Sequence, residues 1–251
     1  MEGCWVIRTY KSGRMVEKSK VWVSSRAKIR SGRVQGNTSA AKRDRNAMQA
    51  VRVLARSFNC NCSHKWLHMV CKLDDAHLAS AEADTEKTLK NFRARLKRAV
   101  EKLGGQVAYY EFISHKDGKS GAEKRLHIHY VIRLEGVRFE DGLWMLGEKA
   151  LEDIWGMGSV WAEPLYNAAD YTDLAAYLLR QSDREGKKAY NPSRNLKKPI
   201  VTERPARTCA PLRAPAGSVL VEQGNWNALY GAHYIRYIAP QKPEERGRRD
   251  E

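Results

Sequence analysis

The alternation of apolar and polar residues predicts a β-strand in the segment "RLHIHYVIRL", residues 125–134. Side chains two residues apart point to the same face of a strand. His127 and His129 therefore share one face, and the apolar side chains that alternate with them share the other. A sheet that contains this strand buries one face in a core and presents two imidazoles on the opposite face.

Hydrophobic periodicity also predicts the elements before and after this strand. Residues 1–30 are predicted to form a β-ribbon around the turn "KSGR", and a helix follows from about Ser39. The remaining predicted elements are strands at 65–74, 106–115 and 159–165, helices at 82–105, 139–156 and 170–183, and a small closing unit at 218–238. The order β-α-β-β-α-β-α from residue 65 onward predicts an α+β fold, in which helices pack on one face of an antiparallel sheet.

Positive charge is concentrated in two parts of the chain, which has 251 residues and a formal net charge of +16. Residues 1–60 hold 14 Lys and Arg against 3 Asp and Glu, a balance of +11. Residues 184–213 hold 9 against 2, a balance of +7. Basic flanks around a nearly neutral middle favour a polyanionic partner, most simply nucleic acid, and the stretch 26–45 is expected to contact phosphates. A basic ribosome-like binding protein would have a similar charge.

Pattern and charge together predict three parts: a basic N-terminal arm at 1–62, a central domain at 63–200 and a C-terminal extension at 201–251. The chain has neither an apolar run long enough to span a bilayer nor a signal-peptide pattern. Its five cysteines are scattered, so we expect reduced thiols, a cytoplasmic location and no membrane partner. A zinc site at Cys60 and Cys62 is a weaker alternative, because the spacing fits no common finger.

A metal site is the first candidate for chemistry. Glu111 lies in the strand before the histidine strand, and the loop 116–124 between them is short. Pairing about the centre of this loop predicts that Glu111 lies opposite His129 and shares its face with both histidines. Two imidazoles and a carboxylate suit Mn²⁺ or Zn²⁺ and, with added waters, Mg²⁺. The alternatives are a cross-strand salt bridge for Glu111 and a solvated sheet face for the histidines.

A tyrosine nucleophile is the second candidate. Tyr177 and Arg180 lie three residues apart in the predicted helix 170–183, so they are expected to share a face as nucleophile and phosphate clamp. Alternatively, Tyr177 belongs to the apolar stripe of the helix. Tyr171 is about 120° away around the helix, and Tyr190 lies in a loop and suits a DNA contact better.

These residues resemble the HUH endonucleases, the superfamily of rolling-circle replication initiation (Rep) proteins. The resemblance rests on "HIH" at 127–129, on "YYEFIS" with Glu111 and on "AAYLLRQ" with Tyr177. It extends to "NTSAAKRDRNAMQAVRVLARSFNCN" and "KKAYNPSRNLKKP", which are similar to phage and plasmid replication proteins of the gene II type, and so covers roughly residues 1–200. Arg180 stands where relatives usually have lysine.

The resemblance implies a Rep/HUH fold and a defined reaction. Glu111, His127 and His129 would hold Mg²⁺ or Mn²⁺, and Tyr177 would attack single-stranded DNA at a replication origin. The products would be a 5′-phosphotyrosine link and a free 3′-OH that primes replication, with a host helicase as a further partner. The DNA-binding residues expected around this site are Lys187, Lys188, Tyr190, Arg194 and Lys197. A relaxase or transposase with the same chemistry, or a non-catalytic nucleic-acid-binding protein with this fold, remains an alternative.

Overall fold

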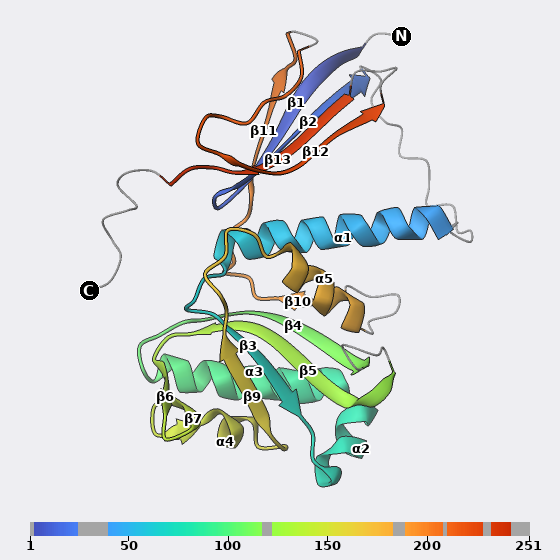
Figure 1. The fold of residues 1–251 in the computed structure, drawn as a ribbon. Helices are drawn as coiled ribbons and strands as arrows, with labels where there is room; N and C mark the ends of the chain where they lie inside the picture. Colours follow the sequence, from blue (N-terminus) through green and yellow to red (C-terminus); the bar gives the residue numbers. More distant parts are fainter. Residues whose placement is uncertain are drawn as a thin grey trace. The chain divides into compact units, whose positions relative to one another are not determined.

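The computed structural model describes residues 3–24, 40–116, 122–182, 189–207, 210–227 and 232–241. Within them the chain is a mixed α+β protein with three antiparallel sheets and five helices (Figure 1). It divides into two compact units, of which the first comprises residues 1–61, 169–172 and 197–251, and the second residues 62–168 and 173–196. The predicted N-terminal arm and C-terminal extension therefore belong to one unit rather than to two separate segments.

The first unit is a five-stranded sheet with one long helix. Its strand order is β11-β1-β2-β13-β12. The elements are β1 (Gly3–Ser12), β2 (Met15–Ser24), α1 (Ala40–Asn61), β11 (Ile200–Pro205), β12 (Val219–Asn227) and β13 (Ala232–Ile238). The β1–β2 ribbon confirms the prediction from the turn "KSGR". Gly13 has φ +58° in this turn, and a Cβ there would lie 2.3 Å from the Asn59 carbonyl oxygen, so only glycine fits.

The second unit contains a five-stranded sheet of order β10-β4-β5-β3-β9. Its elements are β3 (Leu67–Lys72), α2 (Asp75–Ala83), α3 (Thr85–Glu101), β4 (Val107–Lys116), β5 (Glu123–Leu134), β9 (Val160–Pro164), α5 (Thr172–Gln181) and β10 (Asn191–Pro192). The apolar stripe of α3, with Leu89 and Phe92 fully buried, packs on the face of β5 that carries Ile128 and Tyr130. Asp84 caps α3, because its Oδ1 accepts from the Lys87 N–H at 3.0 Å.

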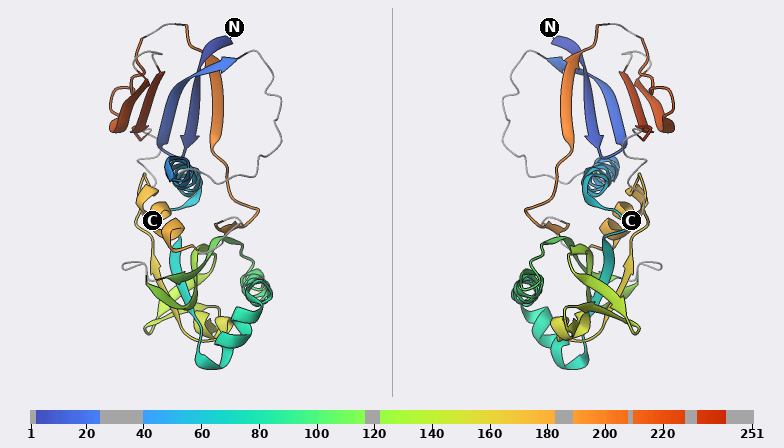
Figure 2. Two further views of the ribbon diagram at one scale, coloured as in Figure 1. Left: turned by 90° about the vertical axis from the view of Figure 1, so that its right-hand side faces the viewer. Right: turned by 90° about the vertical axis from the view of Figure 1, so that its left-hand side faces the viewer.

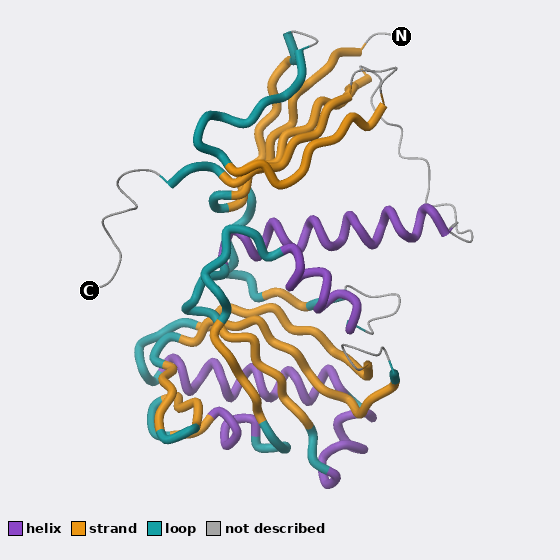
Figure 3. Tube along the Cα trace, viewed as in Figure 1, coloured by secondary structure: helices purple, strands orange, loops and turns teal. Residues whose placement is uncertain are grey.

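The predicted helix at 139–156 was wrong. This part of the chain forms three short strands and one short helix, β6 (Val137–Glu140), β7 (Leu143–Leu146), β8 (Lys149–Ala150) and α4 (Leu151–Trp155) (Figure 3). Asp141, Gly142 and Gly147 have φ of +49°, +81° and +62°. Left-handed residues at these two turns interrupt a helix and reverse the chain, so the apolar periodicity that suggested one helix is shared among four elements.

Helices cover both faces of the second unit's sheet, whereas the sequence predicted only one. Helix α3 packs on the core face, and α5 lies on the opposite face (Figure 2). There the Tyr177 ring packs against those of His68 and His129. The histidine face is therefore partly covered by a helix. In the part of the chain that the structure describes, no helix is both long enough and apolar enough to cross a membrane.

Candidate active site on the histidine face

The position of Glu111 differs from the sequence prediction. In the β4–β5 pair, Glu111 lies opposite Tyr130, and Phe112 lies opposite His129. Directly paired residues share a face, so Glu111 points into the core and away from both histidines. The expected pairing of Glu111 with His129 was wrong. The observed register differs by one residue from pairing about the loop centre, because the ladder is irregular between Ser114 and Lys116, and a difference of one residue moves a side chain to the other face.

Glu111 is instead the centre of a buried ion pair. Its side chain is fully buried, and the Arg93 Nη1 donates to both carboxylate oxygens at 2.8 and 2.7 Å. The Tyr130 hydroxyl donates to Oε2 at 2.8 Å. Burial, reinforced by the charge of Glu111, holds the pKa of Tyr130 well above its usual range. The salt-bridge interpretation of Glu111 thus describes this residue, although its partner comes from α3 and not from a strand.

A third histidine joins His127 and His129. In β3, His68 lies opposite Val131, and this pairing places it on the histidine face. The His68 Nε2 and His129 Nδ1 share a hydrogen bond at 3.1 Å, with their rings stacked at 5.4 Å between centroids. The ring of His127 is 5.0 Å from that of His129. Sequence analysis missed His68, although the alternation in "LHMVCK" already placed it opposite the apolar face.

Burial keeps the imidazoles of His68 and His129 neutral. It lowers the pKa of His68 to about 4. Burial also lowers the pKa of His129 to about 3, together with repulsion from the other two imidazoles. The Nδ1 of His127 lies 2.9 Å from the Arg125 carbonyl oxygen, which only accepts, so Nδ1 carries the proton and Nε2 carries the lone pair. Neutral imidazoles are the form that binds metal ions.

The donors fit a divalent ion, but they do not form a complete ligand set. Among the described residues no group of three His, Cys, Asp or Glu side chains is arranged to hold a metal. However, the 3.1 Å between His68 Nε2 and His129 Nδ1 is close to the spacing of neighbouring ligands with metal–nitrogen bonds of about 2.1 Å. An ion at this position would be bound through the His129 Nδ1, so the buried Nε2 of the same ring is not one of its ligands.

Tyr177 lies against this histidine cluster. It extends from α5, and its ring is nearly perpendicular to those of His68 and His129, at 6.1 and 6.3 Å between centroids. Its side chain is partly exposed and lines a pocket together with His127 and His129. The sheet and α5 thus bring a phenol beside neutral imidazoles at a surface that solvent can reach.

The two other candidate tyrosines are placed differently. Tyr171 is 5% exposed and belongs to the first unit. Tyr190 packs on the ring of Phe112 at 5.6 Å, and burial raises its pKa. Neither ring is among the described residues that line the pocket of Tyr177. Of the three tyrosines, Tyr177 is the one that lines the described pocket, and its role as the nucleophile stays a prediction.

Arg180 does not accompany Tyr177 into the pocket, as the helical spacing had predicted. Arg180 is exposed, and it is not among the described residues that line the pocket. Gln181, one residue later and four after Tyr177, is buried and lines the pocket instead. Residues three and four positions after Tyr177 both lie near its face of the helix. In the packed structure the residue at the fourth position, Gln181, faces the pocket.

Four cations surround the pocket, which has a volume of about 480 Å³. They are Lys72, Lys116, Lys124 and Arg125. The wall also contains apolar side chains and a hydroxyl, from Val70, Leu73, Leu126 and Ser159. The pocket therefore combines a phenol and imidazoles with positive charge, which suits a phosphate group.

Tyr190, Arg194 and Lys197, the expected DNA-binding residues that the structure describes, are not among the residues that line this pocket. Arg194 lines another pocket together with Arg93 and Asn191. Lys197 belongs to the first unit, where its N–H donates to the Asn61 Oδ1 at 2.8 Å. Lys187, Lys188 and most of the basic stretch 26–45 lie outside the described residues. The pocket's own cations form no cluster in the sequence, because they are scattered over three strands.

Comparisons of this chain with protein-family models, with curated proteins and with solved structures found no match. Its function therefore has to be inferred from the geometry and charge of the site.

Proposed function

We propose that the protein is an HUH-type endonuclease that nicks and rejoins single-stranded DNA and initiates rolling-circle replication. The observation that carries the proposal is that Tyr177 packs against His68 and His129 and lines, with His127 and His129, a pocket that is also lined by four cations. The order and pairing of the strands in the second unit are consistent with a Rep/HUH fold. The basic flanks of the chain suit a long polyanion such as DNA.

Several residues of the pocket have a role in the proposed reaction. Lys72 and Lys124 bind the DNA phosphates, and the Tyr177 oxygen attacks the scissile phosphorus. A tyrosine O–P bond forms as the bond from phosphorus to the 3′ oxygen breaks. The phenol proton passes to water, which reaches the partly exposed Tyr177 in the pocket. The 5′ phosphate stays on the protein, and the released 3′ oxygen takes a proton and becomes a primer.

A divalent ion would be held by His68, His127 and His129, without Glu111, and because these rings are not arranged as a ligand set in the structure, they would have to turn toward the ion. When bound, it supplies positive charge that polarises the scissile phosphate. Replacing a carboxylate by a third imidazole shifts the expected preference from Mg²⁺, which favours oxygen ligands, toward Mn²⁺ and softer ions. Glu111 is not one of the proposed ligands, because its carboxylate is buried in the core and paired with Arg93 of α3.

A nicking assay tests the proposal. The protein is incubated with single-stranded DNA from its own replicon, labelled at either the 3′ or the 5′ end, with Mn²⁺ or with chelator. We expect 3′-labelled DNA to remain on the protein after denaturation, and 5′-labelled DNA to be released with an extendable 3′-OH. The DNA sequence that is cut distinguishes a replication initiator from a relaxase or transposase. DNA binding with no cleavage under any metal would instead select the non-catalytic alternative.

The cations of the pocket provide a second prediction. The double variant Lys72→Gln and Lys124→Gln should bind single strands of every sequence more weakly. The slope of log affinity against log salt should become shallower by about 0.7 for each phosphate that the variant no longer neutralises. Titration at several salt concentrations measures this slope. The matched control, Lys87→Gln with Lys90→Gln, removes the same charge from the exposed surface of α3, and an equal effect there would contradict a role of the pocket.

A further inference from the structure

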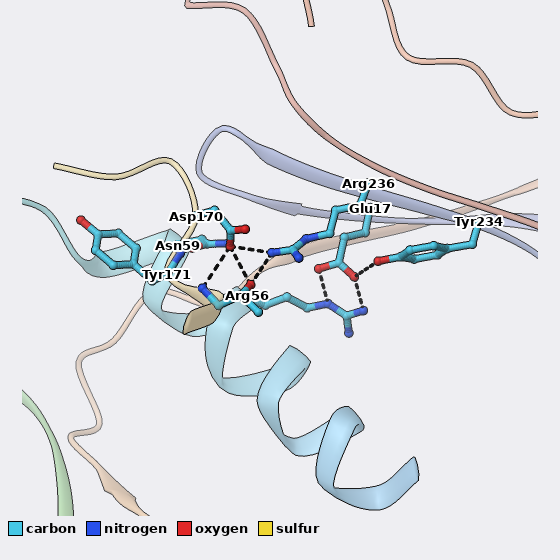
Figure 4. Close-up of polar contacts among 8 residues, drawn as sticks. Glu17, Arg56, Asn59, Asp170, Tyr171, Tyr234 and Arg236 are labelled. Carbon is cyan, nitrogen blue, oxygen red and sulfur yellow. Dashed lines mark hydrogen bonds and ion pairs between the residues drawn. The ribbon is translucent and has the colours of Figure 1, made fainter. Parts of the chain in front are cut away.

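The two faces of the sheet in the first unit differ in charge. Strand pairing places all acidic residues of its five strands on one face: Glu17, Glu203 and Glu222. Each of them forms an ion pair with an arginine. Helix α1 contacts this face, because its Arg56 donates to both Glu17 oxygens at 3.0 and 2.6 Å. Figure 4 shows this pair, together with the Tyr234 hydroxyl that donates to the same carboxylate. The negative charge of the sheet is therefore paired on the face that α1 contacts.

The opposite face has basic side chains and, among the strand residues that the structure describes, no acidic one. Alternation along β1, β2 and β11 places four cations on it: Lys11, Lys18, Lys20 and Arg204. The loop after β11 covers part of this face, where Leu212 packs with Ile235 and Tyr237. Lys11 and Arg204 are exposed. A polyanion at this face therefore meets positive charge with no carboxylate of the strands beside it.

Two tryptophans lie beside each other on this basic face. Trp5 and Trp22 are directly paired in β1 and β2, with ring centroids 5.5 Å apart and ring planes at 70°. A Cβ at Gly3 would lie 2.8 Å from two carbons of the Trp22 ring, so the missing side chain gives this ring its room. Contacts with Trp5 and Gly3 hold the Trp22 ring, and Trp22 is still 51% exposed. A held and exposed ring loses little conformational freedom when a planar group stacks on it.

We infer that this face is a second binding surface for single-stranded DNA, on which a base stacks against Trp22 while Arg204 and the neighbouring cations bind phosphates. Arg204 lies opposite Ile7, the next residue on this face after Trp5, about 7 Å along the strand. Aromatic rings combined with cations bind single strands of any sequence, because every base has a stacking face and every nucleotide has a phosphate. A duplex offers no unstacked base, so the surface selects single strands. The inference shares its partner with the proposed function but goes beyond it, since none of these residues is among those that line the pocket of Tyr177.

The affinities for two probes test the inference: an oligothymidylate, and a strand of the same length in which an abasic site replaces every base. The proteins are full chains that carry Lys72→Gln and Lys124→Gln, so that the pocket of Tyr177 contributes little, and chelator prevents cleavage. This parent is compared with Trp22→Ala and with Trp22→Phe, which keeps an aromatic ring. The matched control is Phe139→Ala, which removes a ring from the second unit at a site that is 61% exposed.

Trp22→Ala should bind the oligothymidylate about 5- to 150-fold more weakly than the parent, which is the loss expected for one base stacked on an aromatic ring. Trp22→Phe should lose less, and all the proteins should bind the abasic strand equally. The inference is overturned if the parent does not bind the oligothymidylate, if Trp22→Ala binds it as the parent does, or if the abasic strand or Phe139→Ala shows the same loss. No adduct is measured, so a failure of the proposed nicking reaction would leave this result unchanged.

Discussion

Tyr177→Phe is expected to bind single-stranded DNA and metal as the wild type does, and to form no covalent adduct. The substitution removes one oxygen and keeps the ring that packs against His68 and His129, so the pocket keeps its shape. Without that oxygen, nothing in the side chain can attack phosphorus. The measurement is the fraction of 3′-labelled DNA that stays on the protein after denaturation.

The matched controls are Tyr190→Phe and Tyr171→Phe. Tyr190 packs on Phe112, and Tyr171 is buried in the first unit, so both variants should still form the adduct. Mass spectrometry of the peptide that carries the nucleotide identifies the residue directly. A nucleotide on Tyr190 or Tyr171, or an adduct formed by Tyr177→Phe, would show that the nucleophile has been misassigned.

Loss of a histidine should be nearly as severe. His68→Ala and His129→Ala are each expected to lower the nicking rate by at least about 100-fold, because even residues that only orient metal ligands cost 10- to 100-fold. Both variants should also weaken Mn²⁺ binding, which calorimetry measures without any DNA. Both side chains lie on the face opposite the apolar core, so circular dichroism should show a folded protein.

Glu111→Gln separates the two possible ligand sets. This change removes the charge that pairs with Arg93 and should lower the free energy of unfolding by about 2–3 kcal/mol, less than for a fully buried pair because Arg93 is partly exposed. Its Mn²⁺ affinity and nicking rate per folded molecule should equal those of the wild type. If Glu111→Gln lost metal while His68→Ala kept it, the set with Glu111 would be correct after all.

Local pattern predicted the elements in which one periodicity dominates. The alternation in 125–134 is visible as β5, and the apolar stripe of 82–105 as α3, because each buries one continuous face. The turn "KSGR" determined the β1–β2 ribbon, since a glycine with positive φ is a local requirement. In the stretch 137–155 local signals conflicted, and turns at left-handed residues prevailed over apolar spacing.

The sequence by itself determined that His127 and His129 share a face, because this follows from the twofold period of one strand. It also determined that Tyr177 lies on a helix. Only the tertiary structure decided which residues join them. A register shift of one residue in the β4–β5 pair turned Glu111 toward Arg93, and the pairing of β3 with β5 brought His68 to His129. Strand register depends on contacts between residues far apart in the chain, so no local pattern contains it.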